Sequence, residues 1–115
     1  MRVQDVLSNA GSLLGSELRI EGFLVGLGDT CYVTNADEAW LDRDHAILLD
    51  QPGLMQRLDR IVGAWIGGRA AYRDDVVVTG RLERSGTDPF PLALRAISSL
   101  VVTREAYAET YQVLP

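Results

Sequence analysis

The stretch at residues 17–27 constrains the fold more than any other part of the chain. In its first half, Leu18 and Ile20 alternate with three charged residues, a period of two that is typical of a strand with one buried face. From Gly22 onward the residues of both parities are apolar or glycine, which indicates burial on both faces. We therefore predict one long strand that is half-buried first and fully buried later. Gly22 stands at the change and indicates a bend between two sheets.

Shorter elements can be placed around this long strand. Residues 26–29 form a turn, residues 35–44 a polar, acidic loop, and residues 85–89 the connection of a hairpin. The predicted elements are a helical turn at 3–7, strands at 17–27, 30–34 and 45–49, a helix at 54–66, strands at 75–84 and 91–103, and a short helix at 105–111. The helix at 54–66 has apolar residues at three- and four-residue spacings, and we expect Gly67 and Gly68 to end it.

Two of these elements carry specific expectations about the core. Trp65 continues the apolar stripe of the predicted helix, so we expect its ring to be buried there. In the strand at 91–103, alternate positions predict a shared apolar face. Its members are Leu92, Leu94, Ala96, Leu100 and Val102.

Two segments resemble parts of small bacterial OB-fold domains. Residues 5–22, D-V-L-S-N-A-G-S-L-L-G-S-E-L-R-I-E-G, are similar to their opening, and residues 76–82, V-V-V-T-G-R-L, to their fourth strand. The resemblance covers residues 3–103 and implies a mainly β fold, a five-stranded Greek-key β-barrel with a helix between strands three and four. A small α+β arrangement with an antiparallel sheet is the alternative. Either way we predict one domain over residues 1–115, with its core at about 15–103.

Size and composition place the chain in an ordinary class of proteins. A chain of 115 residues can bury one real core without a disulfide or a metal. Cys31 is the only cysteine, so no internal disulfide forms, and an unpaired thiol fits a reducing compartment. The first residues lead into no apolar run, and no stretch reaches the roughly 18 apolar residues of a membrane helix. We therefore expect a cytoplasmic protein without a membrane partner.

The net charge of −5 is concentrated in one part of the chain. Residues 29–50 hold six acids and one base, Arg43, and six minus one accounts for the whole net charge, because the other ten acids and ten bases cancel. An OB-fold binds single-stranded nucleic acid across strands two and three, and such a site needs a positive groove with aromatic platforms. Tyr32 could stack a base, but the acids lie beside it. Arg81 and Arg95 belong to other strands, where we expect them not to compensate. Nucleic-acid binding is therefore the alternative function.

Catalytic and cofactor patterns are weak. Asp42, Asp44 and His45 offer ligands for a divalent cation, but the spacing does not match an EF-hand, and a metal-dependent enzyme at this cluster remains a third alternative. Cys31 and His45 lack a third, orienting group for nucleophilic catalysis. The glycines at 26–28 and 11–15 lack the rest of a dinucleotide or phosphate-loop motif. We predict no catalytic residue, no metal and no cofactor.

The acidic loop itself is the predicted functional site. Trp40 interrupts it with a large apolar ring, which acts either as a wedge that anchors the loop on the barrel or as a contact for a partner. The predicted partner-binding residues are Asp37, Glu38, Trp40, Asp42 and Asp44. Charge would steer a basic protein to this face. One concrete form is a cytoplasmic immunity protein that neutralises a basic toxin such as a nuclease, and a generic adaptor fits equally well.

Overall fold

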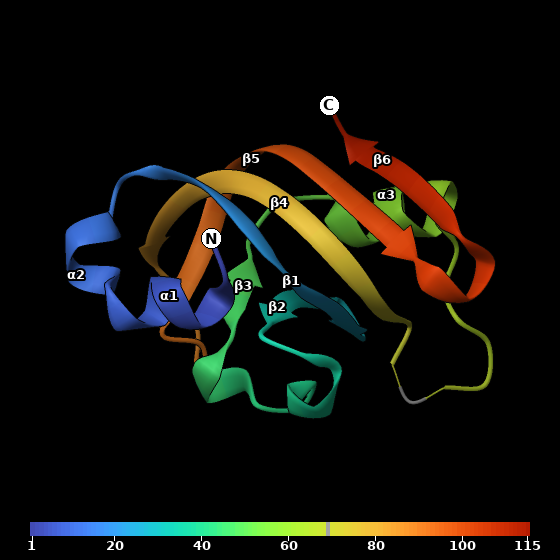
Figure 1. Cartoon of the computed structure of the whole chain (residues 1–115), viewed down its shortest axis with the longest axis horizontal. Coiled ribbons are helices and arrows are strands. Elements are labelled where there is room, and N and C mark those ends of the chain that lie inside the picture. The colour runs from blue at the N-terminus through green and yellow to red at the C-terminus, as the bar shows by residue number, and fades with distance from the viewer. Residues whose placement is uncertain (69) are drawn as a thin grey trace.

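Five strands of the chain close into a barrel (Figure 1). The computed structural model describes residues 1–68 and 70–115. The strand order is β3-β2-β1-β4-β5, and β3 closes the ring by pairing in parallel with β5, whereas the other neighbours are antiparallel. A helix, α3, lies between β3 and β4 in the chain. The predicted mainly β, OB-like Greek-key barrel is thereby confirmed.

The elements follow the predicted order as far as β5, and the structure adds the helix α2, three short 3₁₀ helices and the strand β6. The helices are α1 (Val3–Ser8), α2 (Ala10–Leu13) and α3 (Leu54–Ile61), and the strands are β1 (Glu17–Leu27), β2 (Thr30–Thr34), β3 (Ile47–Leu49), β4 (Tyr72–Arg84), β5 (Leu92–Arg104) and β6 (Glu109–Leu114). The acidic loop contains two short 3₁₀ helices, η1 (Asp37–Ala39) and η2 (Arg43–His45), and a third, η3 (Glu105–Tyr107), precedes β6. His45 thus belongs to the loop, and the strand predicted at 45–49 begins only at Ile47.

The long strand β1 changes its setting at Gly22, as predicted. Before Gly22 its side chains alternate between exposed and buried, and after it Leu24 and Val25 are both fully buried. Gly22 also lies where β1 crosses β2 closely. A Cβ at this position would lie 2.6 Å from Cγ1 of Val33 and 2.7 Å from the carbonyl oxygen of Thr34. Only a residue without a side chain fits that crossing.

The barrel interior is filled from every strand and covered at its ends by helices. In Figure 1, α1 and α2 lie at one end of the barrel and α3 at the other. Val3 and Val6 of α1 and Leu54 and Leu58 of α3 are buried in the same apolar core. The two ends of the barrel are therefore covered by segments that are far apart in the sequence.

The helix predicted at 54–66 is shorter in the structure. The backbone N–H groups of Val62 and Gly63 both donate to the carbonyl oxygen of Leu58, and Gly63 has a φ of 86°. This left-handed residue ends the helix one turn before Trp65. The expectation that Trp65 packs on the apolar stripe of the helix is therefore wrong, and its ring lies instead on a partly exposed loop.

The tail predicted as a helix at 105–111 forms a sixth strand. After η3, Ala108 turns the chain with a φ of 53°, and β6 then pairs antiparallel with β5. The spacing of Tyr107 and Tyr111 indicated a helical face, but the pairing available along β5 decides the conformation, because tertiary context overrides weak local patterns.

The prediction that Ala96 belongs to the apolar face of β5 is also wrong. The pairing of β4 with β5 shifts its register between Thr79 and Arg81, so β5 bulges opposite Gly80. Ala96 has a φ of 49° and is exposed, and Ile97 enters the core in its place. The bulge places one odd-numbered residue in the core between Leu94 and Leu100, and alternation alone does not reveal it.

The tight crossing at Gly22 leads to a prediction about stability. Gly22→Ala places a methyl group against a side chain and a backbone oxygen of β2, so we expect it to lower the free energy of unfolding by about 2 kcal/mol. The matched control is Gly11→Ala in α2, where a Cβ meets nothing within 4 Å and should raise stability by about 0.5 kcal/mol. Urea denaturation measures the free energy of unfolding of both variants. Equal changes in the two would contradict a tight contact between Gly22 and β2.

Candidate protein-binding surface

The outer face of β1, β2 and β3 is covered by the chain itself. A second apolar cluster lies there, separate from the barrel interior, with Tyr32 at its centre and Trp40 packed against it. Its buried members are Val25, Tyr32, Ala46, Ala70 and Phe90. Tyr32 has no exposed surface, and its ring lies 5.3 Å from that of Phe90. This is the face on which OB-folds bind single strands, and here Tyr32 is not accessible to a base.

Trp40 anchors the acidic loop to this cluster. Its side chain is half-buried, and its backbone carbonyl oxygen accepts a hydrogen bond from the hydroxyl of the buried Tyr32. The guanidinium of Arg73 lies 4.7 Å from the centre of the indole ring, within the range of a cation–π contact. Arg73 also donates to the carboxylate of Asp37. These contacts correspond to the wedge expected as one role of Trp40.

The other predicted partner-binding residues face solvent. Glu38, Asp42 and Asp44 are exposed, and Leu41 between them keeps 55% of its surface exposed. Asp37 is exposed as well but is paired with Arg73. The loop thus presents an apolar side chain among acids, held in place by the ring of Trp40. Whether these residues contact a partner remains a prediction.

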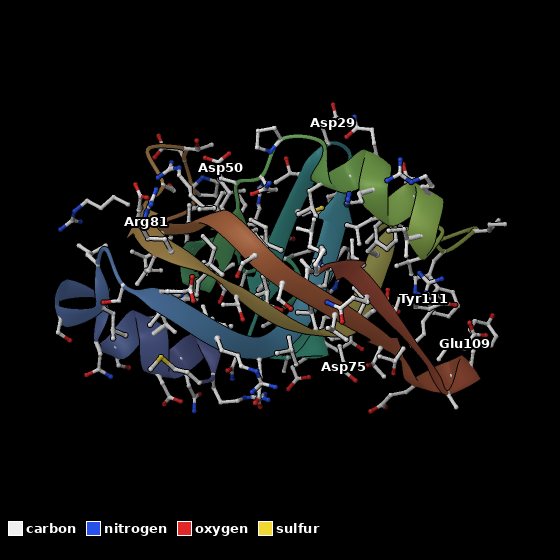
Figure 2. All side chains as sticks on the ribbon, turned by 90° about the horizontal axis from the view of Figure 1, so that it is seen from above. Asp29, Asp50, Asp75, Arg81, Glu109 and Tyr111 are labelled. Atoms are coloured by element: carbon white, nitrogen blue, oxygen red, sulfur yellow. The ribbon has the colours of Figure 1, made fainter. Side chains whose placement is uncertain are left out.

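Part of the negative charge is neutralised by arginines of other strands. Because β3 and β5 run parallel at the closure of the barrel, Arg95 lies next to Asp50, and its Nε donates to that carboxylate over 2.8 Å. The expectation that Arg95 does not compensate the acids is therefore wrong. Figure 2 shows Asp29 and Asp50 at one edge of the molecule and Asp75 at the opposite edge. Asp29 and Asp50 therefore lie apart from Asp75 rather than on one face with it.

Of the residues considered for catalysis, Asp42 and His45 are in contact, but they form no larger cluster within the described residues. Within the described ranges 1–68 and 70–115, no three His, Cys, Asp or Glu side chains are placed to hold a metal ion. Cys31 faces the barrel interior, where burial, and secondarily the charge of Asp59, raises the pKa of its thiol to about 12. The thiol of Cys31 is therefore inert at neutral pH. His45 is exposed on the loop.

A groove of about 520 Å³ lies beside the acidic loop, over the start of β4 and the end of β5. Its floor follows from the sheet register, because Phe23, Asp75 and Thr103 stand opposite one another on β1, β4 and β5. Directly opposed residues share a face of the sheet. The outer side of this row is therefore lined by one aromatic ring, one carboxylate and one hydroxyl.

The walls of the groove come from two loops. Trp65 and Ile66 belong to the segment after α3, and Glu105 belongs to η3. Ile66 is fully exposed. Asp37 and Arg73 also line the groove, which brings it into contact with the acidic loop. Of these residues, the sequence had indicated only Asp37 as functional.

A buried ion pair holds the wall of the groove. The guanidinium of Arg104 donates from Nε to Asp74 over 3.0 Å, and these side chains are only 8% and 2% exposed. Trp65 donates its indole N–H to the same carboxylate over 3.1 Å. Its ring lies 4.2 Å from the guanidinium of Arg104 and is stacked on Tyr107 at 5.4 Å. The loop that carries Trp65 is thus fastened to the end of the barrel.

The sequence did contain a signal for this pair. Asp74 shares its parity in β4 with the buried Val76 and Val78, and Arg104 shares its parity in β5 with Leu100 and Val102. A charged residue at a core position needs a partner. Two such residues of opposite charge on neighbouring strands predict a buried pair. The strands were expected to begin at 75 and end at 103, which left both residues out.

Comparisons with known proteins add no relative. No protein-family model, no curated protein and no solved structure matches the chain. Among the described residues, no helix has the length and apolar character needed to cross a bilayer.

The buried pair leads to a second prediction. Asp74→Asn leaves the guanidinium of Arg104 buried without its counter-charge, so we expect the free energy of unfolding to fall by about 3 kcal/mol. The control is Glu21→Gln, which breaks the exposed pair with Arg19 and should cost less than about 0.5 kcal/mol. Chemical denaturation measures both. Equal costs would contradict a structural role of the buried pair.

The contact of His45 with Asp42 leads to a third prediction. The Asp42 carboxylate lies 3.0 Å from Nδ1 of His45 and, by hydrogen bond and charge, raises the pKa of the imidazole above its ordinary value of 6.5. The pair therefore stabilises the fold below pH 6.5, and this contribution is lost as the pH rises through the folded-state pKa. In an NMR titration, Asp42→Asn should return the pKa of His45 toward 6.5. Asp44→Asn should change it less, because Asp44 acts only through its charge.

Proposed function

We propose that the chain is a non-catalytic protein-binding module that docks a basic partner on residues 37–44 of its acidic loop. The observation that carries the proposal is the exposed Leu41, which stands among exposed acids on a loop fastened to the barrel by Trp40. A fixed loop loses little conformational entropy on binding. Its acids can steer a basic partner, and Leu41 can become buried in the contact.

The contacts of the loop support a preformed site. Tyr32, Arg73 and the second apolar cluster hold Trp40, while Glu38 and Asp44 make no ion pair with any residue in the described ranges. Their charges are therefore available to a partner. The charge of Asp37 is shared with Arg73, so we assign it a role in positioning the loop.

A cytoplasmic immunity protein that neutralises a basic toxin, such as a nuclease, is one concrete form of this function. Such a protein must cover a positively charged active site, and an acidic surface with an apolar centre is suited to that task. A generic adaptor has the same requirements. Testing whether the chain protects cells against the product of a neighbouring reading frame separates the two.

The alternative functions have less support. The covered face of Tyr32 and the net charge of −5 both disfavour binding of single-stranded nucleic acid, which depends on cations and exposed aromatic rings. A metal-dependent enzyme would need Asp42, Asp44 and His45 to converge on one ion. Asp42 contacts His45, but among the described residues no three such side chains are placed to hold a metal ion.

The fourth prediction tests the loop. A photo-crosslinking residue at Leu41, introduced in the native cell, should capture a basic protein. For the purified captured protein, Glu38→Gln combined with Asp44→Asn should lower the association rate constant about threefold at low salt and less at high salt, because salt screens exposed charges. Surface plasmon resonance measures the rate.

The control removes the same two charges elsewhere. Glu17→Gln combined with Asp29→Asn changes exposed acids outside the loop and should leave the rate within about 1.5-fold, because screened charges act locally. Equal slowing by both double variants would show attraction by net charge alone and contradict the proposal. Capture of nucleic acid without any protein at Leu41 would also contradict it.

A further inference from the structure

We propose that the groove beside the loop receives an arginine or lysine side chain of the basic partner, next to an apolar residue of the same segment. This inference rests on the proposed function and names a second contact for it. The groove adjoins the loop because Asp37 and Arg73 line it. A partner docked on residues 37–44 therefore lies within reach of the groove.

The charges around the groove favour a cation. Asp75 on the floor and Glu105 on the wall are both exposed. Neither forms an ion pair with any residue of 1–68 or 70–115. The pair Asp37–Arg73 is neutral in sum, and so is the buried pair beneath Trp65. The unpaired negative charge around the groove is thus carried by the carboxylates of Asp75 and Glu105.

A smaller hollow next to the groove is also lined by carboxylates. Phe23, Asp37, Asp75 and Glu105 line both spaces, and Arg2 enters only the second one. The guanidinium of Arg2 is engaged with the backbone carbonyl oxygen of Asn35 over 3.1 Å. Because the positive charge of Arg2 lies in the neighbouring hollow, we expect the partner's cation to bind in the part of the groove between Asp75, Glu105 and Trp65.

The apolar walls fit the stem of a long basic side chain. The ring of Trp65 is already held between Arg104 and Tyr107, so it offers a fixed apolar wall rather than an open platform for a cation. Arginine and lysine bury their methylene stems against such surfaces while their charged heads remain near carboxylates and water. Phe23 on the floor provides a second apolar contact.

Exposed apolar side chains at the rim indicate a protein segment as the occupant. Ile66 is 100% exposed and Tyr107 is 59% exposed, and Ile66 lines the groove. A free cation such as a polyamine would leave Ile66 in water, whereas a peptide residue beside the basic one can cover it. Nucleic acid would place phosphates next to Asp75 and Glu105. A second copy of this acidic chain offers less charge complementarity than a basic partner.

The experiment uses the full chain and a blocked tripeptide amide, arginine–leucine–arginine. In an NMR titration of the ¹⁵N-labelled protein we expect saturable shifts at Asp75, Thr103, Glu105 and the indole N–H of Trp65. Asp75→Asn combined with Glu105→Gln should weaken binding about fivefold, as two exposed ion pairs would. Both residues are exposed, and an unchanged amide spectrum elsewhere verifies the fold.

Matched controls separate the groove from general attraction. The loop variant Glu38→Gln with Asp44→Asn removes equal charge and should weaken tripeptide binding less than the groove variant does, because Glu38 and Asp44 do not line the groove. A glutamate–leucine–glutamate tripeptide should not bind. Equal weakening by both double variants, absence of saturable shifts, or equally tight binding of spermine would each overturn the inference.

The experiments give different results if the inference about the groove is wrong and if the proposed function is wrong. If the captured basic protein responds to the loop variant but the tripeptide does not bind in the groove, the groove inference is overturned and the proposed function stands. If the captured protein responds to neither double variant, both are overturned. Slower association with the loop variant together with faster dissociation with the groove variant supports both.

Discussion

Burial of β1 on both faces past Gly22 is the constraint on which the rest of the structure depends. Leu24 faces the barrel interior and Val25 faces the second apolar cluster. Because apolar side chains occupy both faces of this half of the strand, other segments must cover much of its outer side. The loop with Trp40, together with Phe90 and Ala70, does so. The same burial that completes the core therefore also fixes the acidic loop in place.

This arrangement changes the use of the barrel surface. In an OB-fold the outer face of strands two and three is the ordinary ligand site, and here Tyr32 of that face is buried in the second apolar cluster. Two surfaces suited to recognition are the rim of the covering loop and the groove over the start of β4 and the end of β5. Both are lined by carboxylates and exposed apolar side chains, a combination that suits a protein rather than a polyanion.

The buried pair Asp74–Arg104 fixes the wall of the groove, as the second apolar cluster fixes the acidic loop. It costs desolvation, and its partners recover that cost only through good geometry and additional hydrogen bonds, which the indole of Trp65 contributes. Replacing it by apolar residues could give an equally stable barrel end. What the pair adds is a defined position for the loop after α3, and hence for the wall of the groove.

Local patterns in the sequence determined the order of strands and the helix between β3 and β4, because alternation, amphipathic spacing and turn residues act within a few positions. They also determined the two-sided burial of β1 and the excess of acids near the loop. The tertiary structure alone decided that the tail becomes β6, that Ile97 replaces Ala96 in the core, and that Arg95 neutralises Asp50. Each depends on which strand edge or charge from a distant part of the chain lies alongside. Pairing across the closed barrel sets that neighbour, and no local pattern records it.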